Sequence, residues 1–96
     1  MTQVNVVATI VAKKGKEKEV EAQLCGLLAP SRKDPGCLSY DLHQSIDDPA
    51  VFVFYETWKS QSLLEDHLKT PHLLAWLDKA PKLTTAFDVK LVTKIG

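Results

Sequence analysis

Apolar residues in the first part of the chain recur first with a strand period and then with a helical one. Residues 4–13 are rich in β-branched side chains and apolar on both faces, which predicts a strand covered on both sides. Apolar residues at helical spacing within 20–28 then predict an amphipathic helix. Pro30 should weaken or end that helix, and Asp34-Pro35-Gly36 predicts a turn.

The middle of the chain predicts a β-hairpin. Side chains in 37–46 alternate cleanly between apolar and polar, which is typical of a half-buried strand. Residues 51–58 are apolar on both faces, so this strand should be central in its sheet. The turn signal Asp47-Asp48-Pro49 joins the two.

The last part of the chain predicts two short helices and a final strand. Ser60 and Ser62 compete as the N-cap of the first helix. Thr70-Pro71 predicts the N-cap and first residue of the second helix, which should end at Pro81. Residues 87–95 alternate again and predict the last strand.

This order of elements predicts an α+β fold. Strand, helix, strand, strand, helix, strand with right-handed crossings gives a ferredoxin-like sandwich, in which the helices cover one face of a four-stranded antiparallel sheet. The whole chain, 1–96, is expected to form this single domain. Because 4–11 and 51–55 are apolar on both sides, the second face needs a cover, and a second copy of the sheet is the simplest one. We therefore expect a homodimer.

Composition excludes several classes of partner. The 12 basic and 12 acidic residues balance and are interspersed, so there is no basic stripe for nucleic acid. There is no apolar run near the length of a membrane span and no signal-like start, so we expect no membrane association and a cytoplasmic location. Cys25 and Cys37 lack metal-ligand spacing and are expected to be buried, reduced thiols.

The candidate chemistry lies at the strand-to-helix junction of residues 56–72. Glu56 and Trp58 share one strand face. Trp58 either walls a flat pocket or packs in the core, and Glu56 orients a histidine, accepts a substrate hydroxyl, or pairs with a lysine or backbone donors. His67 lies on the apolar side of its helix, as a satisfied core residue or as a base whose pKa is near neutral. His72 is either a capping or surface histidine or a second polar contact.

A metal centre is not expected from these histidines. His67 and His72 are five positions apart with a helix break between them, and no third ligand has an obvious place. The chain also has no glycine-rich phosphate loop, so we expect no flavin. Asn5, Tyr40 and Phe54 are further candidates to line a pocket, although the sequence alone indicates mostly packing roles for them.

Several short motifs together resemble the antibiotic biosynthesis monooxygenase domain family. They are Gly36 to Tyr40, the turn 47–49, Glu56-x-Trp58-x-Ser60, and Leu64-Glu65-x-His67-Leu68-x-Thr70-Pro71-His72. The resemblance covers almost the whole chain, and the last two motifs are most similar to the quinol monooxygenase branch. It implies a dimeric α/β barrel that oxidises electron-rich phenols with molecular oxygen and no cofactor.

The chain departs from other branches of that family. Members that oxidise polyketide anthrones have an asparagine where this chain has Phe54, and a tyrosine where it has Leu64. Haem-degrading members have an asparagine near the position of Ala8 and a histidine near Leu77, so haem degradation is disfavoured.

The resemblance therefore implies a cofactor-independent monooxygenase acting on a quinol or related aromatic phenol. His67 would be the base, Glu56 its orienting partner and Trp58 the pocket wall, while His72, Phe54, Asn5 and Tyr40 would contact the substrate. Two alternatives stay open, a non-catalytic small-ligand or stress-response module of the same fold and a small isomerase.

Overall fold

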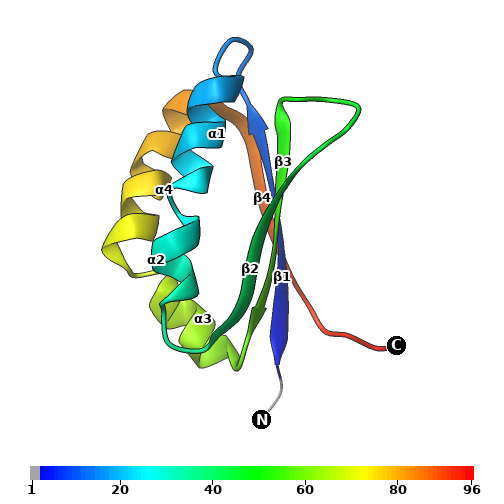
Figure 1. Cartoon of the computed structure of the whole chain (residues 1–96), viewed down its shortest axis with the longest axis vertical. Coiled ribbons are helices and arrows are strands. Elements are labelled where there is room, and N and C mark those ends of the chain that lie inside the picture. Colours follow the sequence, from blue (N-terminus) through cyan, green and yellow to red (C-terminus); the bar gives the residue numbers. More distant parts are fainter. Residues whose placement is uncertain (1–2) are drawn as a thin grey trace.

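The computed structural model describes residues 3–96, which form four strands and four helices (Figure 1). The order confirms the predicted α+β pattern, with the first and last helical regions each divided in two. The elements are β1 (Val4–Ala12), α1 (Glu17–Cys25), α2 (Leu28–Arg32), β2 (Cys37–Gln44), β3 (Val51–Trp58), α3 (Gln61–His67), α4 (Pro71–Leu83) and β4 (Thr84–Val92).

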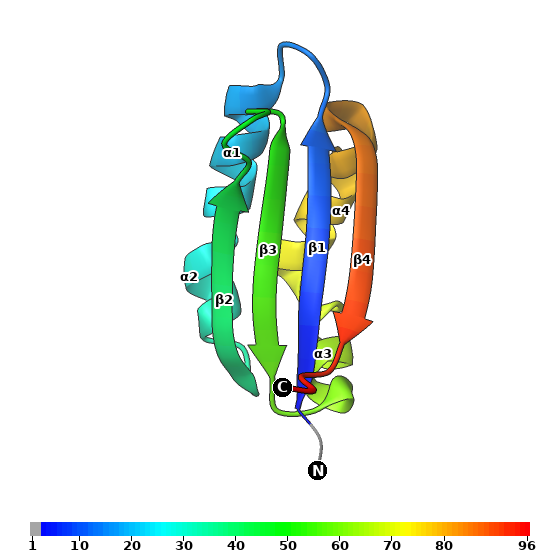
Figure 2. The same ribbon diagram turned by 90° about the vertical axis from the view of Figure 1, so that its right-hand side faces the viewer.

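The strands form one antiparallel sheet in the order β2-β3-β1-β4. The helices all lie on one face of it, and no helix or strand of residues 3–96 lies on the other face (Figures 1 and 2). This is the ferredoxin-like arrangement that the sequence predicts. The two central strands pair along their full lengths, from Val4 opposite Trp58 to Val11 opposite Val51.

The core lies between the sheet and the helices. One row of β1 side chains points into it, and Val6, Ala8 and Ile10 are at most 5% exposed. From β3, Phe52 and Phe54 extend the same layer, again almost fully buried. Burying a valine, isoleucine or phenylalanine side chain stabilises the fold by about 1.5–3 kcal/mol, so this row fixes which face of the sheet the helices cover.

Of the two prolines expected to end helices, only Pro81 differs from the prediction, because α1 ends at Cys25 and a separate short helix follows. Pro30 lies inside α2, where it occupies the first turn and its missing N–H has no intrahelical partner to lose. Pro81 does not end α4, which continues to Leu83. Ala80 and Leu83 are both buried in the core, and this packing offsets the cost of the lost helical hydrogen bond. The last strand accordingly begins earlier than predicted, at Thr84.

The helix starts around the candidate site follow local sequence signals. Ser60, rather than Ser62, is the N-cap of α3, and its hydroxyl accepts a hydrogen bond from the Leu63 amide at 3.2 Å. Thr70 and Pro71 are the N-cap and first residue of α4, as predicted. Together they set the short connection that brings α4 back over the sheet.

The second face of the sheet is apolar and partly exposed. Its central side chains include Val7, Val11 and Val53, and Tyr55 is 44% exposed. Both cysteines are free, but Cys25 is exposed and Cys37 is only half-buried, so the prediction of two buried thiols is wrong. Within residues 3–96, no helix is both long and apolar enough to cross a membrane.

Candidate active site

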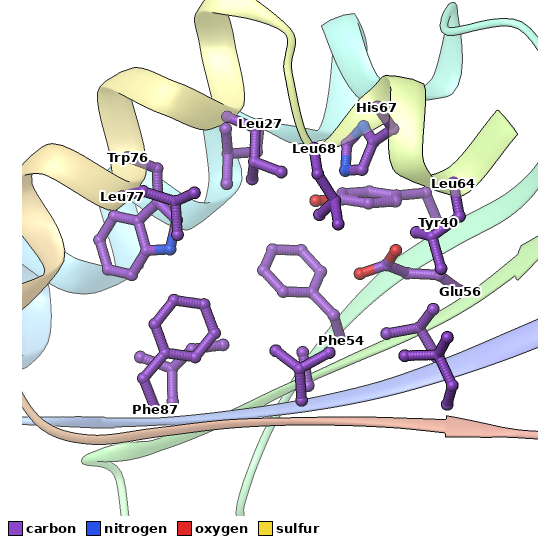
Figure 3. Close-up of a pocket in the computed structure, with 16 residues that line it drawn as sticks. Leu27, Tyr40, Phe54, Glu56, Leu64, His67, Leu68, Trp76, Leu77 and Phe87 are labelled. Atoms are coloured by element: carbon purple, nitrogen blue, oxygen red, sulfur yellow. The ribbon is translucent and has the colours of Figure 1, made fainter. Parts of the chain in front are cut away.

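A cavity of about 110 Å³ lies between the sheet and the helices α3 and α4 (Figure 3). Its wall is mostly aliphatic and aromatic, with Phe54 and Phe87 from the sheet and Trp76 from α4. Three titratable side chains also line it, and these are Tyr40, Glu56 and His67. An apolar cavity with a few convergent polar groups is the usual form of a small-molecule site.

The cavity is open toward the edge strand β4. Phe87, Val89 and Leu91 belong to its lining, yet each is between 37% and 48% exposed. These side chains face the helix layer, but no helix of the chain covers them fully. A ligand can therefore enter over β4 while the opposite end of the cavity stays closed.

Glu56 stands at the closed end and is 5% exposed. Its Oε1 accepts a hydrogen bond from the indole Nε1 of Trp58 at 2.9 Å. Burial raises the pKa of Glu56 to about 7, and the bond from Trp58 opposes part of that rise. In Figure 3 the carboxyl group points into the cavity beside Phe54. It can act there as either donor or acceptor near neutral pH.

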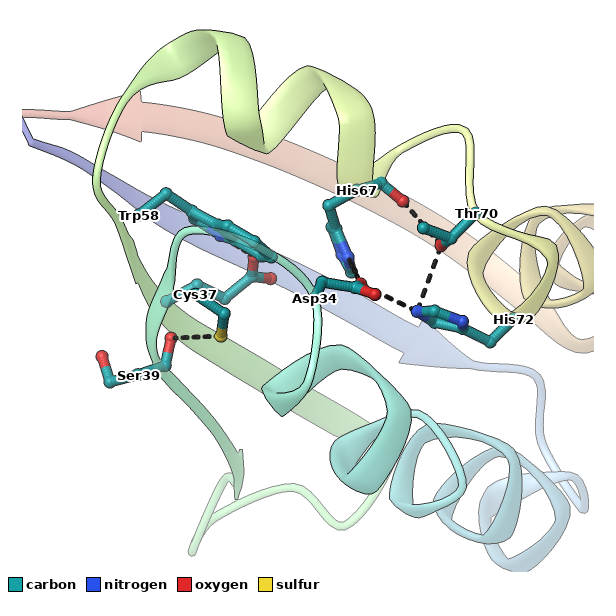
Figure 4. A network of polar contacts seen from close by, with 8 residues as sticks. Asp34, Cys37, Ser39, Trp58, His67, Thr70 and His72 are labelled. Carbon is teal, nitrogen blue, oxygen red and sulfur yellow. Dashed lines mark hydrogen bonds and ion pairs between the residues drawn. The ribbon is translucent and has the colours of Figure 1, made fainter.

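His67 makes its polar contact with Asp34, a residue that the sequence indicated only as part of a turn (Figure 4). The His67 Nδ1 lies 2.7 Å from Asp34 Oδ2, and the His72 Nε2 lies 2.9 Å from the same oxygen. Thr70 donates to the His67 carbonyl and lies 3.1 Å from His72 Nε2. Glu56 is therefore not the partner of His67, because its bonded neighbour is the Trp58 indole.

The loop before β2 holds Asp34 in this position. Its amide donates to the Ser31 carbonyl, and its carbonyl accepts from the Cys37 amide. Gly36 has a φ of +84°, and a Cβ there would lie 2.5 Å from Leu63 Cδ1. Only glycine permits this close approach of the loop to α3, which carries His67 at its C-terminal end.

His67 is a neutral imidazole held in one orientation. Burial lowers its pKa, and the hydrogen bond and charge of Asp34 oppose that shift. The Nδ1–H is assigned as donor to the Asp34 carboxylate, since a carboxylate can only accept, and Nε2 is then the nitrogen with a free lone pair. The ring is 3% exposed and packs 4.6 Å from Trp58 and 5.5 Å from Tyr40, measured between ring centroids.

Tyr40 completes the polar side of the cavity. Burial, and then the nearby Glu56 carboxyl, raises the pKa of its phenol above the ordinary range. The hydroxyl therefore stays protonated at neutral pH and is a hydrogen-bond donor. Its ring packs 4.9 Å from Phe54, between centroids, and closes the cavity against β2.

The structure brings together some of the predicted site residues and separates others. Tyr40, Phe54, Glu56 and His67 line the cavity. Trp58 is completely buried behind them and is not part of the wall, so of its two predicted positions the structure favours packing in the core. The cavity lining also excludes His72, which borders a separate surface depression formed by parts of α1 and α4.

Asn5 belongs to the other row of β1. It alternates with the cavity-lining Val6 and pairs with Thr57 and Val92, so the predicted contact with a substrate in this cavity is wrong. Trp76 takes the position in the wall that the sequence suggested for Trp58. No motif in the sequence singled out Trp76 as a lining residue.

The reason for expecting no metal also changes with the structure. Asp34, His67 and His72 place one ligand atom each within 4.8 Å of one another. In the sequence the two histidines have no obvious third ligand, whereas in the structure Asp34 supplies one. A carboxylate and two imidazoles are a recognised donor set for divalent transition metals.

The fold and cavity define a small α+β protein with a mostly apolar cavity that three titratable side chains also line. The sequence model described as "Antibiotic biosynthesis monooxygenase" matches residues 3–79. The chain belongs to this family, as its motifs indicated.

Individual relatives agree with that assignment. The chain is 30% identical over 82 residues to the protein named "Putative monooxygenase Rv0793" of Mycobacterium tuberculosis, a match that covers 85% of this chain and 80% of that protein. It is 32% identical over 78 residues to an uncharacterised protein of Synechocystis, a match that covers 81% of this chain but only 53% of that protein.

Solved structures share the fold along the full chain. The crystal structure of PA3566 from Pseudomonas aeruginosa superposes with a TM-score of 0.95 at 33% identity, covering 100% of this chain and 97% of that one. The structure of Rv0793 has a TM-score of 0.93 at 27% identity and covers 99% of this chain and 97% of that one.

Proposed function

We propose that the protein is a cofactor-independent monooxygenase that oxidises a quinol or a related phenol with molecular oxygen. The observation that carries this proposal is the Asp34–His67 pair at the wall of a small apolar cavity. Asp34 fixes one nitrogen of the imidazole and leaves the other free to accept a proton. The names of relatives as monooxygenases support the same reaction class.

In the proposed reaction His67 Nε2 removes the proton of a substrate hydroxyl. The phenolate that results transfers one electron to oxygen, and the substrate radical and superoxide then combine to form a carbon–peroxide bond. Loss of water breaks the O–O bond and leaves a new carbonyl on that carbon. One oxygen atom thus enters the substrate and the other leaves as water, so no external reductant is needed.

The surroundings of His67 favour that chemistry. The neutral imidazole is a base matched to neutral pH, and Asp34 stabilises the imidazolium that forms. Apolar walls exclude water from the radical pair. The protonated Tyr40 hydroxyl and the Glu56 carboxyl are available to bind a second oxygen atom on the substrate, which suits a quinol better than a simple phenol.

The cavity volume limits the substrate. A dry cavity of about 150 Å³ accommodates benzene in another protein, so 110 Å³ with one open side suits a single aromatic ring whose substituents extend over β4. Phe54, Phe87 and Trp76 provide faces on which such a ring can pack.

We further propose that the protein is a homodimer whose two sheets face each other. The helix-free face carries apolar side chains from β1 and β3, and Val7, Val11 and Val53 are each only half-buried in the single chain. A second copy of the same face would cover these valines, in an interface where both subunits use the same surface and are related by a two-fold axis.

Oxygen consumption tests the proposed reaction. Purified protein is mixed with a panel of mono- and bicyclic hydroquinones in an oxygen electrode, and we expect uptake of one O₂ per substrate with formation of the hydroxylated quinone. His43→Ala serves as a matched control, because this imidazole is exposed on β2 and is not part of the cavity lining. Saturable binding of the same compounds without oxygen uptake would instead identify a ligand-binding module.

A further inference from the structure

We propose that Asp34, His67 and His72 form a binding site for a divalent transition-metal ion of the Zn²⁺ class, and that its occupation switches off the base. Three side chains from separate segments converge here, from the loop before β2, the end of α3 and the start of α4 (Figure 4). The inhibitory consequence rests on the proposed function, whereas the binding of the ion does not.

The geometry is close to what an ion requires. His67 Nδ1 and His72 Nε2 lie 2.7 and 2.9 Å from Asp34 Oδ2, so both imidazole edges are directed at one carboxylate oxygen. Ligands about 2.1 Å from a tetrahedral Zn²⁺ stand roughly 3.4 Å apart. Each oxygen–nitrogen distance therefore needs to lengthen by about 0.5–0.7 Å, and the two ring nitrogens, now within 4.8 Å of one another, need to stand about 3.4 Å apart. The ion then replaces the protons that now join the rings to the carboxylate.

The ligand set is also chemically suited to such an ion. Two imidazoles and one carboxylate bind Zn²⁺, Co²⁺ and Fe²⁺ well, whereas Ca²⁺ and Mg²⁺ prefer a larger number of oxygens. Three protein ligands leave a fourth position for water. His72 is 22% exposed in its side chain and borders the depression near α1, which gives the ion a route from solvent that does not pass through the substrate cavity.

Metal binding and base catalysis exclude each other at His67. In the metal-free protein, Nδ1 carries the proton and Nε2 the free lone pair. An ion bound at Nδ1 forces the proton of the neutral ring onto Nε2, the nitrogen that must accept the substrate proton. Asp34 is occupied at the same time and no longer stabilises an imidazolium. The cluster is therefore a site at which a metal ion inhibits the reaction by fixing the wrong tautomer.

Calorimetric titration with Zn²⁺ tests the binding directly. The protein is first treated with EDTA and dialysed, and we expect one ion to bind per chain. Asp34→Ala and His72→Ala should each weaken binding by about 10²-fold or more, because each removes one of three ligands. Co²⁺ provides a second measurement, since its visible absorption reports on the ligand geometry, and the absorption should change in both variants.

Two further variants separate this site from adventitious binding. His43→Ala removes an exposed imidazole on β2, and Cys37→Ser removes the thiol nearest in sequence to Asp34. Both should bind Zn²⁺ as the unmodified chain does. Binding that is equally strong in Asp34→Ala and His72→Ala, or that disappears in Cys37→Ser, would overturn the assignment. Circular dichroism of each variant verifies that a loss of binding is not a loss of fold.

Oxygen uptake then tests the inhibition. Zn²⁺ should suppress quinol oxidation in proportion to occupancy, and EDTA should restore it. In His72→Ala, with inhibition measured against that variant's own metal-free rate, the half-inhibiting Zn²⁺ concentration should be about 10²-fold or more higher than in the unmodified chain. Quinol oxidation without Zn²⁺ binding would remove the metal site and leave the proposed function intact. Zn²⁺ binding by a protein that never consumes oxygen would remove the proposed function and leave the metal site intact.

Discussion

Asp34 and His67 are 33 positions apart in the chain, yet their side chains meet at 2.7 Å inside the protein. The carboxylate is 13% exposed and the imidazole 2%, so water screens the contact little. The pairing fixes the orientation of a histidine that would otherwise be only a core residue, as the proposed role of His67 as a base requires. It also makes the loop before β2, and not only the junction of β3 and α3, part of the candidate active site.

Removal of the base is the first prediction. His67→Ala should lower quinol-dependent oxygen uptake by about 10²-fold or more, the usual loss when a general base is removed. His43→Ala should leave uptake unchanged. An active His67→Ala protein whose fold is intact would exclude His67 as the base. Equal losses of activity and thermal stability would instead favour a packing role.

Replacing Asp34, the partner of His67, should change both the rate and its dependence on pH. Asp34→Asn keeps the size of the side chain but removes the charge that stabilises the imidazolium, and activity should fall by about 10²-fold. Because the charge of Asp34 raises the pKa of His67, its loss should lower that pKa further. The acid limb of the pH–rate profile should then move to lower pH. A packing role for Asp34 would leave the position of that limb unchanged.

The fold was predictable because its signals are local. Alternation in β2, the doubly apolar β1 and β3, and the Thr70-Pro71 helix start all depend on neighbouring residues, and the structure confirms them. The error at Pro81 arises where packing outweighs local preference. Buried Leu83 keeps α4 helical beyond a residue that would end an isolated helix.

The site was only partly predictable, for the opposite reason. His67 and Glu56 stood out because polar groups on apolar faces need partners. The identity of those partners depends on long-range geometry. Asp34 in an Asp-Pro-Gly sequence indicates a turn and nothing more, and no spacing rule joins it to a helix that begins after residue 60. Trp58 likewise satisfies Glu56 from within the core, as two strand residues on one face can.

The raised pKa of Glu56 predicts a dependence of stability on pH. Its folded value of about 7 exceeds the ordinary value of 4.5, so the folded protein holds this proton more tightly. The resulting stability is fully present below about pH 4.5 and is lost as pH rises through about 7. The difference is about 3 kcal/mol at most. The lowered pKa of His67 makes the folded protein less stable as pH falls below the ordinary pKa of histidine, which is the opposite dependence. Only a comparison of variants therefore isolates the contribution of Glu56.

Glu56→Gln makes that comparison. The neutral amide can still accept from the Trp58 indole but has no proton to lose, so the variant should be more stable than the unmodified chain at pH 8 and should lack the decline between pH 5 and 7. Urea unfolding at a series of pH values measures both the stability at pH 8 and its decline between pH 5 and 7. Parallel curves for the two proteins would mean that Glu56 does not titrate in this range. Oxygen uptake should fall less than in His67→Ala, because the base remains.

Gly36 provides a test of how the loop positions Asp34. Gly36→Ala must place a non-glycine residue at a φ of +84° and a Cβ 2.5 Å from Leu63 Cδ1. Backbone strain of about 1–2 kcal/mol and overpacking of about 1–3 kcal/mol should add. Gly15→Ala is the matched control, because its φ is +87° and its Cβ would contact nothing within 4 Å. The second variant should lose only the backbone contribution in urea unfolding and should keep its activity.

The helix-free face of the sheet can be tested through the mass of the protein in solution. Light scattering at micromolar concentration should return about twice the chain mass of 10.7 kDa. Val53→Lys places a charge in the middle of that face, where the two-fold axis would bring two such charges close together, and should shift the mass toward the monomer. Ala29→Lys adds the same charge to an exposed position on α2 and should leave the dimer unchanged. If Ala29→Lys dissociates the dimer and Val53→Lys does not, the subunits associate through the helices, and the apolar face of the sheet requires another cover. A monomer mass for the unmodified chain would reject the dimer itself.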